Sequence, residues 1–317
     1  MSINAKTVSA IIAVYNDEQA IPVMHERLTT VFKSIGCRYE IIFVNDGSPD
    51  NSEEVLRLLA QKDSHVTVIT HSRNFSSQNA FMSGMRIATG DAVVLLDGDL
   101  QDPPELIKEF VSKWSEGFDV VYGIRVKRDA SLFLRVAYVL FYRLFQKLSY
   151  VRIPRDSGDF SLMDRKVVDI LTAMPERDLF IRGLRAWVGF RQTGVPYHRP
   201  ERMFGKTTNN VLKNVRWAKK AIFSFSYEPL EMLFYSAVLI SFITFLAIIF
   251  YFVSYLITPG QPQGTTTIIL LILFFSSVQL ISISIIGEYL GRIFEEVKGR
   301  PTFIVKEILN KPGNPKE

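Results

Sequence analysis

Two long uncharged stretches near the C-terminus constrain the fold of this chain more than any other feature. Residues 233–257 and 265–286 contain no charged side chain, and each is long enough to cross about 30 Å of hydrocarbon as a helix. Residues 258–264 connect them with prolines, glycines and no charge. A buried helical hairpin in a soluble core is the alternative, but it does not explain the absence of charge over such a length. The sequence therefore predicts two membrane spans joined by a tight turn.

Basic residues lie on the outer flanks of both predicted spans. They are Lys213, Arg216, Lys219 and Lys220 before the first span, and Arg292, Lys298 and Arg300 after the second. Because basic flanking segments stay in the cytoplasm, we expect both termini in the cytosol and the turn on the outer side of the inner (cytoplasmic) membrane. The predicted parts are a cytosolic domain (1–210), a basic juxtamembrane segment (211–229), a transmembrane hairpin (230–287) and a cytosolic tail (288–317).

The composition agrees with a cytosolic N-terminal domain. The 317 residues carry a formal net charge of +5 and include one cysteine, Cys37. A single cysteine excludes an intrachain disulfide framework and fits a reducing compartment. The apolar run at residues 8–14 is too short to be the core of a signal peptide. We therefore expect this domain to remain on the cytosolic side.

The N-terminal domain alternates short apolar runs with amphipathic segments. Strands are predicted at residues 8–14, 39–44, 66–69 and 92–96, and helices at residues 21–32, 52–62 and 77–88. Alternation at this spacing is typical of an α/β fold with a mostly parallel sheet, right-handed crossovers and flanking helices. We expect these strands to lie side by side in one sheet.

Polar side chains gather where the predicted strands end. They are Asn16, Asp17 and Glu18, then Asp46, then Arg73 and Asn74, and finally Asp97 and Asp99. Any one group could be ordinary loop chemistry, but the ends of parallel strands meet at one sheet edge, where open α/β folds bind ligands. The chain has neither a glycine-rich dinucleotide motif nor a P-loop, so neither of those folds is supported.

The pair Asp97 and Asp99 follows the most apolar of the predicted strands. Residues i and i+2 of an extended chain point the same way, so both carboxylates can converge on one hard cation. An EF-hand is excluded because the sixth position from Asp97 is Asp102 instead of glycine and the twelfth is Lys108 instead of glutamate. The pattern predicts a divalent cation shared with a diphosphate.

Basic residues in the middle of the chain suggest an anionic ligand near a membrane. Residues 131–150 have apolar side chains near helical spacing, interleaved with arginine and lysine, as in helices that lie on a membrane surface. A core-facing helix with a solvated basic side fits the pattern equally well, and the nearby spans favour the membrane. Just upstream, Arg125, Lys127 and Arg128 follow a predicted strand at 120–123, which would place cations beside the diphosphate.

Several motifs carry a resemblance to a known family. In the N-terminal domain they are Val14-Tyr15-Asn16-Asp17-Glu18, Val44-Asn45-Asp46-Gly47-Ser48, Ser72-Arg73-Asn74-Phe75 and Asp97-Gly98-Asp99-Leu100-Gln101-Asp102-Pro103-Pro104-Glu105. Near the C-terminus they are Gly287-Glu288-Tyr289-Leu290-Gly291-Arg292 and Glu295-Glu296-Val297-Lys298-Gly299-Arg300-Pro301. Together these motifs resemble inverting family-2 glycosyltransferases of the A-type fold. The C-terminal motifs are most similar to polyprenyl-phosphate (bactoprenol) glucosyltransferases, relatives of dolichyl-phosphate mannose synthase.

The resemblance implies residues for the donor and the metal. The donor nucleotide would be bound by Tyr15, Asn16, Glu18, Asp46, Asn74 and Asp97. Asp46 would accept a hydrogen bond from the base. Asp99 and Gln101 would hold Mg²⁺ or Mn²⁺ on the diphosphate, where a divalent ion offsets the charge of the leaving group. The sequence departs from the family at residues 75–78, where relatives often have glycine and a basic residue after the phenylalanine.

The acceptor residues are also implied by the resemblance. Arg125, Arg128, Arg202 and Lys206 would bind the phosphate of a lipid acceptor, and arginine suits this role because it forms bidentate phosphate contacts. Asp156 or Asp159 would be the catalytic acidic residue, orienting the acceptor or tuning its protonation. A structural cap or turn role for one of the two is the alternative.

The function implied is transfer of one sugar from a nucleotide donor to undecaprenyl (polyprenyl) phosphate with inversion at C1, as in O-antigen or lipopolysaccharide modification. UDP-glucose is the leading donor, and N-acetylglucosamine, an aminoarabinose derivative and GDP-mannose remain open. Expected partners are the nucleotide sugar, the lipid, the membrane and further copies of this chain, with a tetramer as one arrangement. No nucleic-acid partner is expected.

Two other functions remain as alternatives. A processive polysaccharide synthase shares the fold, but such enzymes need more spans and a Q-x-x-R-W motif. Residues 213–217 read Lys-Asn-Val-Arg-Trp and lack the glutamine. A non-enzymatic membrane scaffold or lipid flippase is the second alternative, against which stands the intact set of acidic residues.

Overall fold

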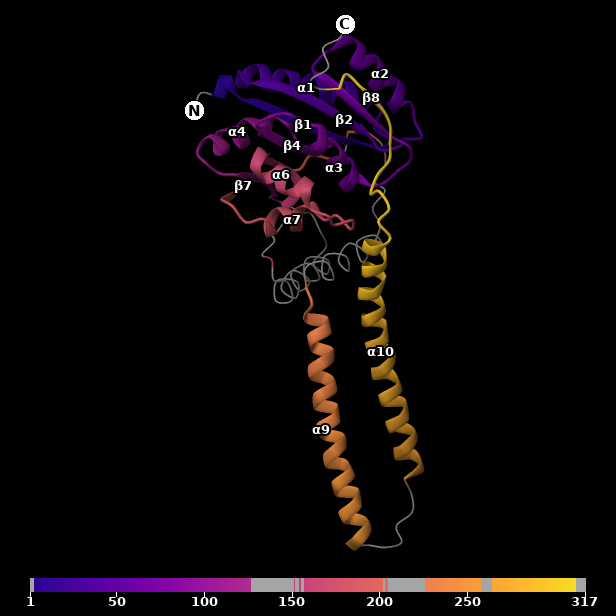
Figure 1. The fold of residues 1–317 in the computed structure, drawn as a ribbon. Coiled ribbons are helices and arrows are strands. Elements are labelled where there is room, and N and C mark those ends of the chain that lie inside the picture. Colours follow the sequence, from indigo (N-terminus) through magenta and orange to yellow (C-terminus); the bar gives the residue numbers. More distant parts are fainter. Residues whose placement is uncertain are drawn as a thin grey trace.

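The computed structural model describes residues 3–126, 151, 154, 157–201, 203–204, 226–257 and 264–311. These residues form an α/β head and two long helices that extend away from it (Figure 1). The first and the last described elements of the chain both lie at the head, although the two helices separate them along the sequence (Figure 1).

The head is built on a mixed sheet. Within the described residues the sheet has eight strands in the order β7-β5-β6-β4-β1-β2-β3-β8. The strands are β1 (Thr7–Val14), β2 (Arg38–Asn45), β3 (Val66–His71), β4 (Ala92–Asp97), β5 (Val120–Arg125), β6 (Ser157–Asp164), β7 (Gln192–Tyr197) and β8 (Val305–Leu309). The four strands predicted from the N-terminal alternation, β1 to β4, form a continuous parallel block.

The remaining strands mix the two directions. Strand β6 is antiparallel to both β4 and β5, and β7 is parallel to β5. Strand β8 is antiparallel to β3 at the other edge. The α/β fold with a mostly parallel sheet is therefore confirmed, with antiparallel strands added on both sides of the parallel block.

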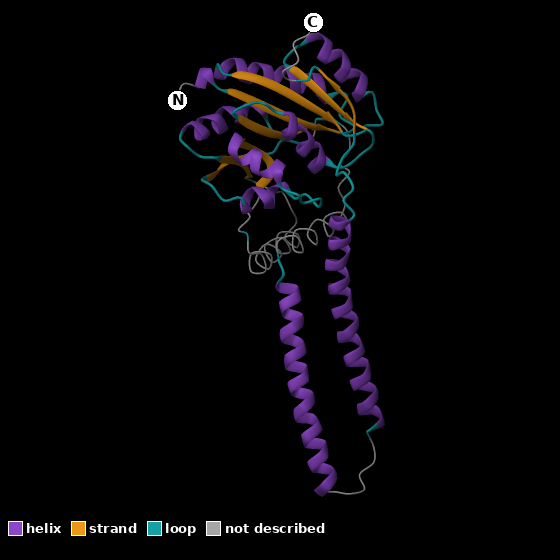
Figure 2. Cartoon of the chain, viewed as in Figure 1, coloured by secondary structure: helices purple, strands orange, loops and turns teal. Residues whose placement is uncertain are grey.

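Helices cover both faces of this sheet (Figure 2). They are α1 (Ala20–Ile35), α2 (Ser52–Lys62), α3 (Ser77–Ile87), α4 (Ile107–Ser115), α6 (Arg165–Ala173) and α7 (Ile181–Trp187), with short 3₁₀ turns η1 (Ile3–Ala5) and η2 (Pro104–Leu106). The first three agree with the predicted helices. Since both faces are covered, the central strands are apolar throughout, as parallel strands usually are.

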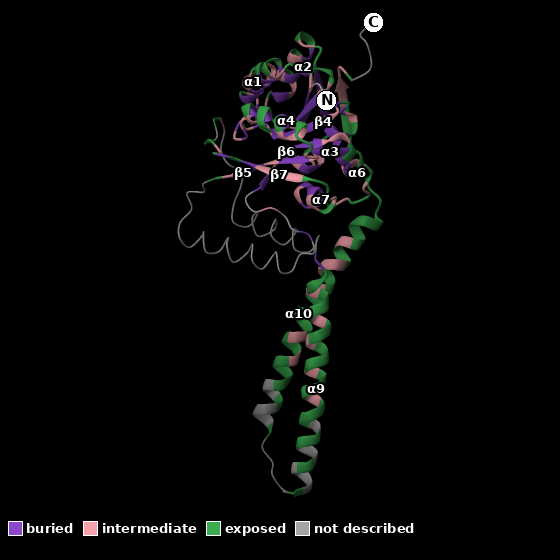
Figure 3. Ribbon diagram, turned by 90° about the vertical axis from the view of Figure 1, so that its left-hand side faces the viewer, coloured by how far each residue is buried: buried purple, intermediate pink, exposed green. Residues whose placement is uncertain are grey.

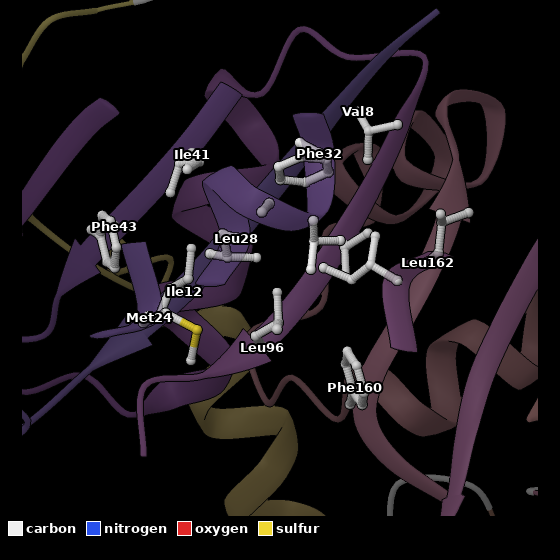
Figure 4. Close-up of a cluster of buried hydrophobic side chains, with 14 of the residues drawn as sticks. Val8, Ile12, Met24, Leu28, Phe32, Ile41, Phe43, Leu96, Phe160 and Leu162 are labelled. Atoms are coloured by element: carbon white, nitrogen blue, oxygen red, sulfur yellow. The ribbon is translucent and has the colours of Figure 1, made fainter. Parts of the chain in front are cut away.

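The two faces have separate hydrophobic cores. Side chains of α1, including Met24, Leu28 and Phe32, pack on one face together with Ile12 of β1 (Figure 4). The neighbouring residue Ile11 points to the opposite face and joins the core formed with α3, α6 and α7. Because successive side chains of β1 point to opposite faces, the strand packs against a layer of helices on each side of the sheet.

Two long helices follow the head. Helix α9 (Glu228–Ile257) and helix α10 (Thr265–Val297) are long and apolar enough to cross a membrane, and the apolar windows within them are not buried by the rest of the described chain. Figure 3 shows exposed residues along most of both helices. Helix α10 continues beyond the uncharged stretch, to Val297. An apolar surface of this size, exposed on both helices, is suited to lipid.

The chain then returns to the head, which the sequence analysis did not anticipate. Strand β8 pairs with β3 and completes the sheet edge. Glu307 accepts two hydrogen bonds from Arg57 of α2, at 2.6 and 3.3 Å. Asn310 Nδ2 donates to the carbonyl oxygens of Ala60 and Val66. Within the predicted C-terminal tail, residues 305–309 therefore form an edge strand of the sheet of the N-terminal domain.

Candidate active site

The loops that follow the parallel strands meet at one edge of the sheet. After β1, the amide of Asn16 donates a hydrogen bond to Ser48 Oγ at 3.2 Å. The carboxylate of Glu18 accepts from the amide of Asn51 through Oε2 at 3.0 Å. These bonds join the β1 loop to the β2 loop, so two of the predicted polar groups lie together.

The loops after β3 and β4 join the same edge. The amide of Phe75, after β3, donates to Asp46 Oδ1 at 2.8 Å, and the amide of Gly98, after β4, donates to the carbonyl oxygen of Ala13 at 2.9 Å. Asp46 is only 2% exposed. A carboxylate this buried requires hydrogen bonds to offset its desolvation. Asp46 is therefore better suited to a specific hydrogen bond than to contact with bulk water.

Three of these loops contain a non-glycine residue in the left-handed region. The φ angles are 58° at Asn16, 81° at Ser76 and 60° at Leu100. Such conformations cost about 1–2 kcal/mol each and persist where the surroundings hold them, often at functional sites. The side chain of Leu100 is buried, and Asn74 Oδ1 accepts a hydrogen bond from the amide of Ser76. The edge is thus a set of constrained loops.

Acidic side chains are crowded at the end of β4. Loss of water around Asp97 raises its pKa to about 8, and the nearby carboxylates of Asp102, Asp99 and Asp159 add to this effect. Arg199 opposes it, and its Nη2 lies 3.9 Å from Asp99 Oδ2. A cation bound at this cluster would lower the pKa of Asp97 and favour its ionised form, because an opposite charge nearby stabilises a carboxylate.

A buried acidic residue beside this cluster was not assigned a role from the sequence. Asp102 is 1% exposed, and its Oδ1 accepts a hydrogen bond from the hydroxyl of Tyr197 at 2.6 Å. Arg125 Nε donates to the same hydroxyl at 3.2 Å. Burial raises the pKa of Asp102, while Arg125 and Arg199 oppose the shift. The contacts hold Arg125 at the edge of the acidic cluster.

Comparison with known proteins identifies the family. The model of the family "Glycosyl transferase family 2" matches residues 9–171, which contain the loops after β1, β2, β3 and β4. This chain belongs to glycosyl transferase family 2. An uncharacterized glycosyltransferase of Bacillus subtilis (strain 168) is 42% identical over 300 residues, which is 94% of this chain and 93% of that protein.

A second relative has a more specific name. The bactoprenol glucosyl transferase of Shigella phage SfII is 38% identical over 310 residues, covering 97% of this chain and 99% of that protein. Among solved structures, mannosyl-3-phosphoglycerate synthase from Rubrobacter xylanophilus is similar over 68% of this chain and 72% of its own, with a TM-score of 0.46 and 16% identity. The family expected from the motifs is confirmed.

The acidic cluster of this glycosyltransferase fits a divalent cation. Asp99 Oδ1 accepts a hydrogen bond from the amide of Gln101 at 3.1 Å, and Gln101 Nε2 donates to the carbonyl oxygen of Pro200 at 3.2 Å. Among the described residues, no three acidic, histidine or cysteine side chains converge to hold a metal. An ion here would need further oxygen ligands from substrate phosphates and water, which is how Mg²⁺ is usually bound.

Asp159 lies beside the cluster and has basic and amide partners. Arg182 Nε is 3.2 Å from Asp159 Oδ1, and Gln78 Nε2 donates to Oδ2 at 3.1 Å. Gln78 also accepts from the amide of Ile181 through Oε1 at 2.8 Å. These contacts fix the Asp159 carboxylate between α3 and α7. A carboxylate held in this way is better suited to orienting a substrate than to removing a proton from it.

The structure places ten of the predicted site residues and leaves four undescribed. Those at or near the shared edge are Tyr15, Asn16, Glu18, Asp46, Asn74, Asp97, Asp99, Gln101, Arg125 and Asp159. Asp156, Arg128, Arg202 and Lys206 lie outside the described residues. The sequence analysis missed Asp102, although it stands within the quoted acidic motif. Arg199 was also given no role, although it stands only three residues before Arg202 in a stretch that resembles the acceptor loop of the family.

Proposed function

We propose that this glycosyltransferase transfers one glucose from UDP-glucose to polyprenyl phosphate with inversion at the anomeric carbon. The observation that carries the proposal is the crowded acidic site at the end of β4, on a head continuous with two exposed apolar helices. Such a molecule suits a water-soluble donor and a membrane-bound acceptor. The names of several relatives, 36–38% identical bactoprenol glucosyl transferases, support glucose as the sugar and a polyprenyl lipid as the acceptor.

The nucleoside would lie on the loops after β1, β2 and β3. The contacts of Asp46 with Phe75 and His71 both use Oδ1, and the described residues offer Oδ2 no hydrogen-bond partner. Oδ2 can therefore accept from N3–H of uracil. Tyr15 is 39% exposed beside this loop, and Asn16, Glu18 and Asn74 shape the same edge through their backbone and side-chain contacts.

The diphosphate would lie over the acidic cluster. Asp99 and the Oε1 atom of Gln101 would hold Mg²⁺ or Mn²⁺, which when bound neutralises the charge on the departing nucleoside diphosphate. Asp97 would face the sugar-nucleotide side of the same cluster. Arg125, held by Tyr197 and Asp102, would supply a positive charge next to the phosphates.

The acceptor phosphate is its own nucleophile. One of its oxygens attacks C1 of the glucose from the face opposite the diphosphate, the C1–O bond breaks, and the bonding pair leaves with UDP. A phosphomonoester with a second pKa near 6 is largely dianionic at neutral pH, so no strong general base is needed. Asp159, or the neighbouring Asp156, would orient the lipid phosphate, and Arg128, Arg202 and Lys206 would bind it.

The two helices would place this reaction at the cytoplasmic face of the membrane. The basic residues before α9 and after α10 support a cytosolic head by the distribution of positive charge. Arg292 pairs with Asp178 at 2.7 Å and the Tyr289 hydroxyl donates to the carbonyl oxygen of Ser226 at 2.7 Å. These contacts join the head to this end of α10, so the head would lie on the same side as the basic flanks. The lipid phosphate would thus enter beside the acidic cluster.

A transfer assay tests the proposal. Purified full-length protein is incubated with Mg²⁺, a short-chain polyprenyl phosphate and radiolabelled UDP-glucose, and label is counted in the organic phase. We expect label to move into the lipid, with a β-linked product by NMR. UDP-N-acetylglucosamine, a UDP-aminoarabinose derivative and GDP-mannose serve as competing donors. A long water-soluble polymer would indicate a processive synthase, and no lipid product from any donor would refute the proposal.

A further inference from the structure

The segment that follows α10 contacts the interior of the donor side. The ring of Phe303 stacks on the ring of His71, the last residue of β3, with centroids 5.3 Å apart and planes at 14°. The guanidinium of Arg86, from α3, lies 5.2 Å from the Phe303 ring centroid. Phe303 thus contacts two side chains of the N-terminal domain, although more than two hundred residues separate it from them.

His71 connects this contact to the donor loop. Its side chain is fully buried, and Nδ1 lies 2.8 Å from Asp46 Oδ1. Because a carboxylate can only accept, Nδ1–H is the donor in this bond. On the other side, His71 Nε2 lies 2.9 Å from Ser83 Oγ. The ring is therefore fixed at both nitrogens and aims one of them at Asp46.

The order Asp46, His71, Ser83 resembles the triad of serine hydrolases, but the surroundings exclude that chemistry here. Ser83 is 2% exposed within α3, and its hydroxyl oxygen lies 3.0 Å from the carbonyl oxygen of Ala80. A nucleophile must reach its substrate, and Ser83 faces the core. These groups are suited to hold Asp46 in one orientation.

We propose that Phe303 is a positioning residue of the donor site, which holds the His71 ring against Asp46 and so prepares Asp46 for the nucleoside. The inference rests on the proposed role of Asp46 in binding the base. It makes the segment after the second apolar helix a working part of the donor site. That segment would otherwise be only an edge strand.

The backbone of this segment is anchored independently of the Phe303 ring. The carbonyl oxygen of Ile304 accepts from the amide of Ser72 at 3.0 Å, and β8 is held by the pair between Arg57 and Glu307. Phe75 meets His71 edge-on from another direction, at 5.7 Å between centroids. Truncating Phe303 should therefore remove one wall of the His71 site without detaching the strand.

A matched pair of variants tests the proposal. Phe303→Ala removes the stacked ring, and Phe303→Leu keeps much of the volume without it. Ile304→Ala is the control, because the Ile304 side chain is 53% exposed. Its backbone carbonyl accepts the hydrogen bond from Ser72, and the variant retains that carbonyl. All are prepared as full-length protein in detergent, and the binding of UDP and of N3-methyl-UDP is measured by calorimetry. N3-methyl-UDP lacks the hydrogen that Asp46 would accept.

We expect Phe303→Ala to weaken UDP binding by about threefold to tenfold, the range expected for a lost aromatic pair. Phe303→Leu should lie between Phe303→Ala and the native protein. Binding of N3-methyl-UDP should change by less than twofold, as should the KM for polyprenyl phosphate. Ile304→Ala should change neither. Equal weakening of both nucleotides in Phe303→Ala would indicate a general structural role, and unchanged UDP binding would also overturn the proposal.

A second measurement keeps this inference separate from the proposed function. The chain has four histidines, so ¹⁵N labelling of histidine gives a small set of ring signals, and His71→Gln identifies that of His71. Phe303→Ala should shift the His71 ring signals, whereas Ile304→Ala should not. If native protein bound no UDP, the proposed donor would be wrong and this shift would still decide the contact. No shift would refute the coupling of Phe303 to His71.

Discussion

Gly47, directly after Asp46, has no room for a side chain. Its φ is +64°, and a Cβ built on it would lie 2.5 Å from the backbone carbon of Arg73 and 2.8 Å from the backbone nitrogen of Asn74. Ordinary contacts begin near 3.4 Å, so the loop after β3 would have to move by about 1 Å. That loop carries the Phe75 amide that binds Asp46.

Gly189 provides a control with the same backbone problem and no clash. Its φ is +79°, and a Cβ there would meet nothing within 4 Å. Gly189→Ala should therefore cost about 1–2 kcal/mol, the penalty for a left-handed residue with a side chain. Gly47→Ala should cost the same backbone penalty and a further amount of about 1–3 kcal/mol for overpacking. For a domain of this size these values correspond to apparent Tm decreases of about 4 °C and about 10 °C.

Thermal unfolding and calorimetry with UDP measure both effects. Gly47→Ala should also weaken UDP binding by at least about tenfold, because the displaced loop loses its bond to Asp46. Gly189→Ala should change UDP binding by less than twofold. Equal losses of Tm in the two variants would refute the clash argument. Native UDP affinity in Gly47→Ala would refute the placement of the donor on this loop.

Three further predictions concern the metal, the acceptor and the membrane. Asp99→Ala should lower turnover by at least about 10², or about 2.7 kcal/mol, and full activity in excess EDTA would contradict the metal assignment. Arg202→Ala should lower kcat/KM for polyprenyl phosphate by about 10² and leave the nucleotide affinity within about threefold. Arg202→Lys should recover only part of the lost kcat/KM. Weakened nucleotide binding with normal acceptor kinetics would assign Arg202 to the donor site. A cysteine at residue 260 should be labelled from outside and one at Lys311 should not, so labelling of both from one side would exclude the hairpin.

Features encoded within short segments could be predicted from the sequence. The uncharged lengths of α9 and α10 and the apolar runs of β1 to β4 require only composition and spacing. The strand-end groups Asp46, Asp97 and Asp99 could also be assigned to one edge, because parallel strands with right-handed crossovers place all their carboxyl ends together. Family motifs then supplied the roles that geometry alone does not give.

Only the tertiary structure decided how distant segments pair. Strand β8 has five residues and is the last described element of the chain, and nothing in its composition selects the edge of β3 as its partner. The contact of Asp102 with Tyr197 and that of His71 with Phe303 join residues far apart in the chain. Such contacts form only after the sheet and the two helices bring the segments together, since no local propensity pays the entropy of closing so long a loop. For this reason the sequence determined the parallel strands β1 to β4 and the acidic edge, and the assembled fold determined the pairing of β6, β7 and β8 and what holds Asp46 and Arg125 in place.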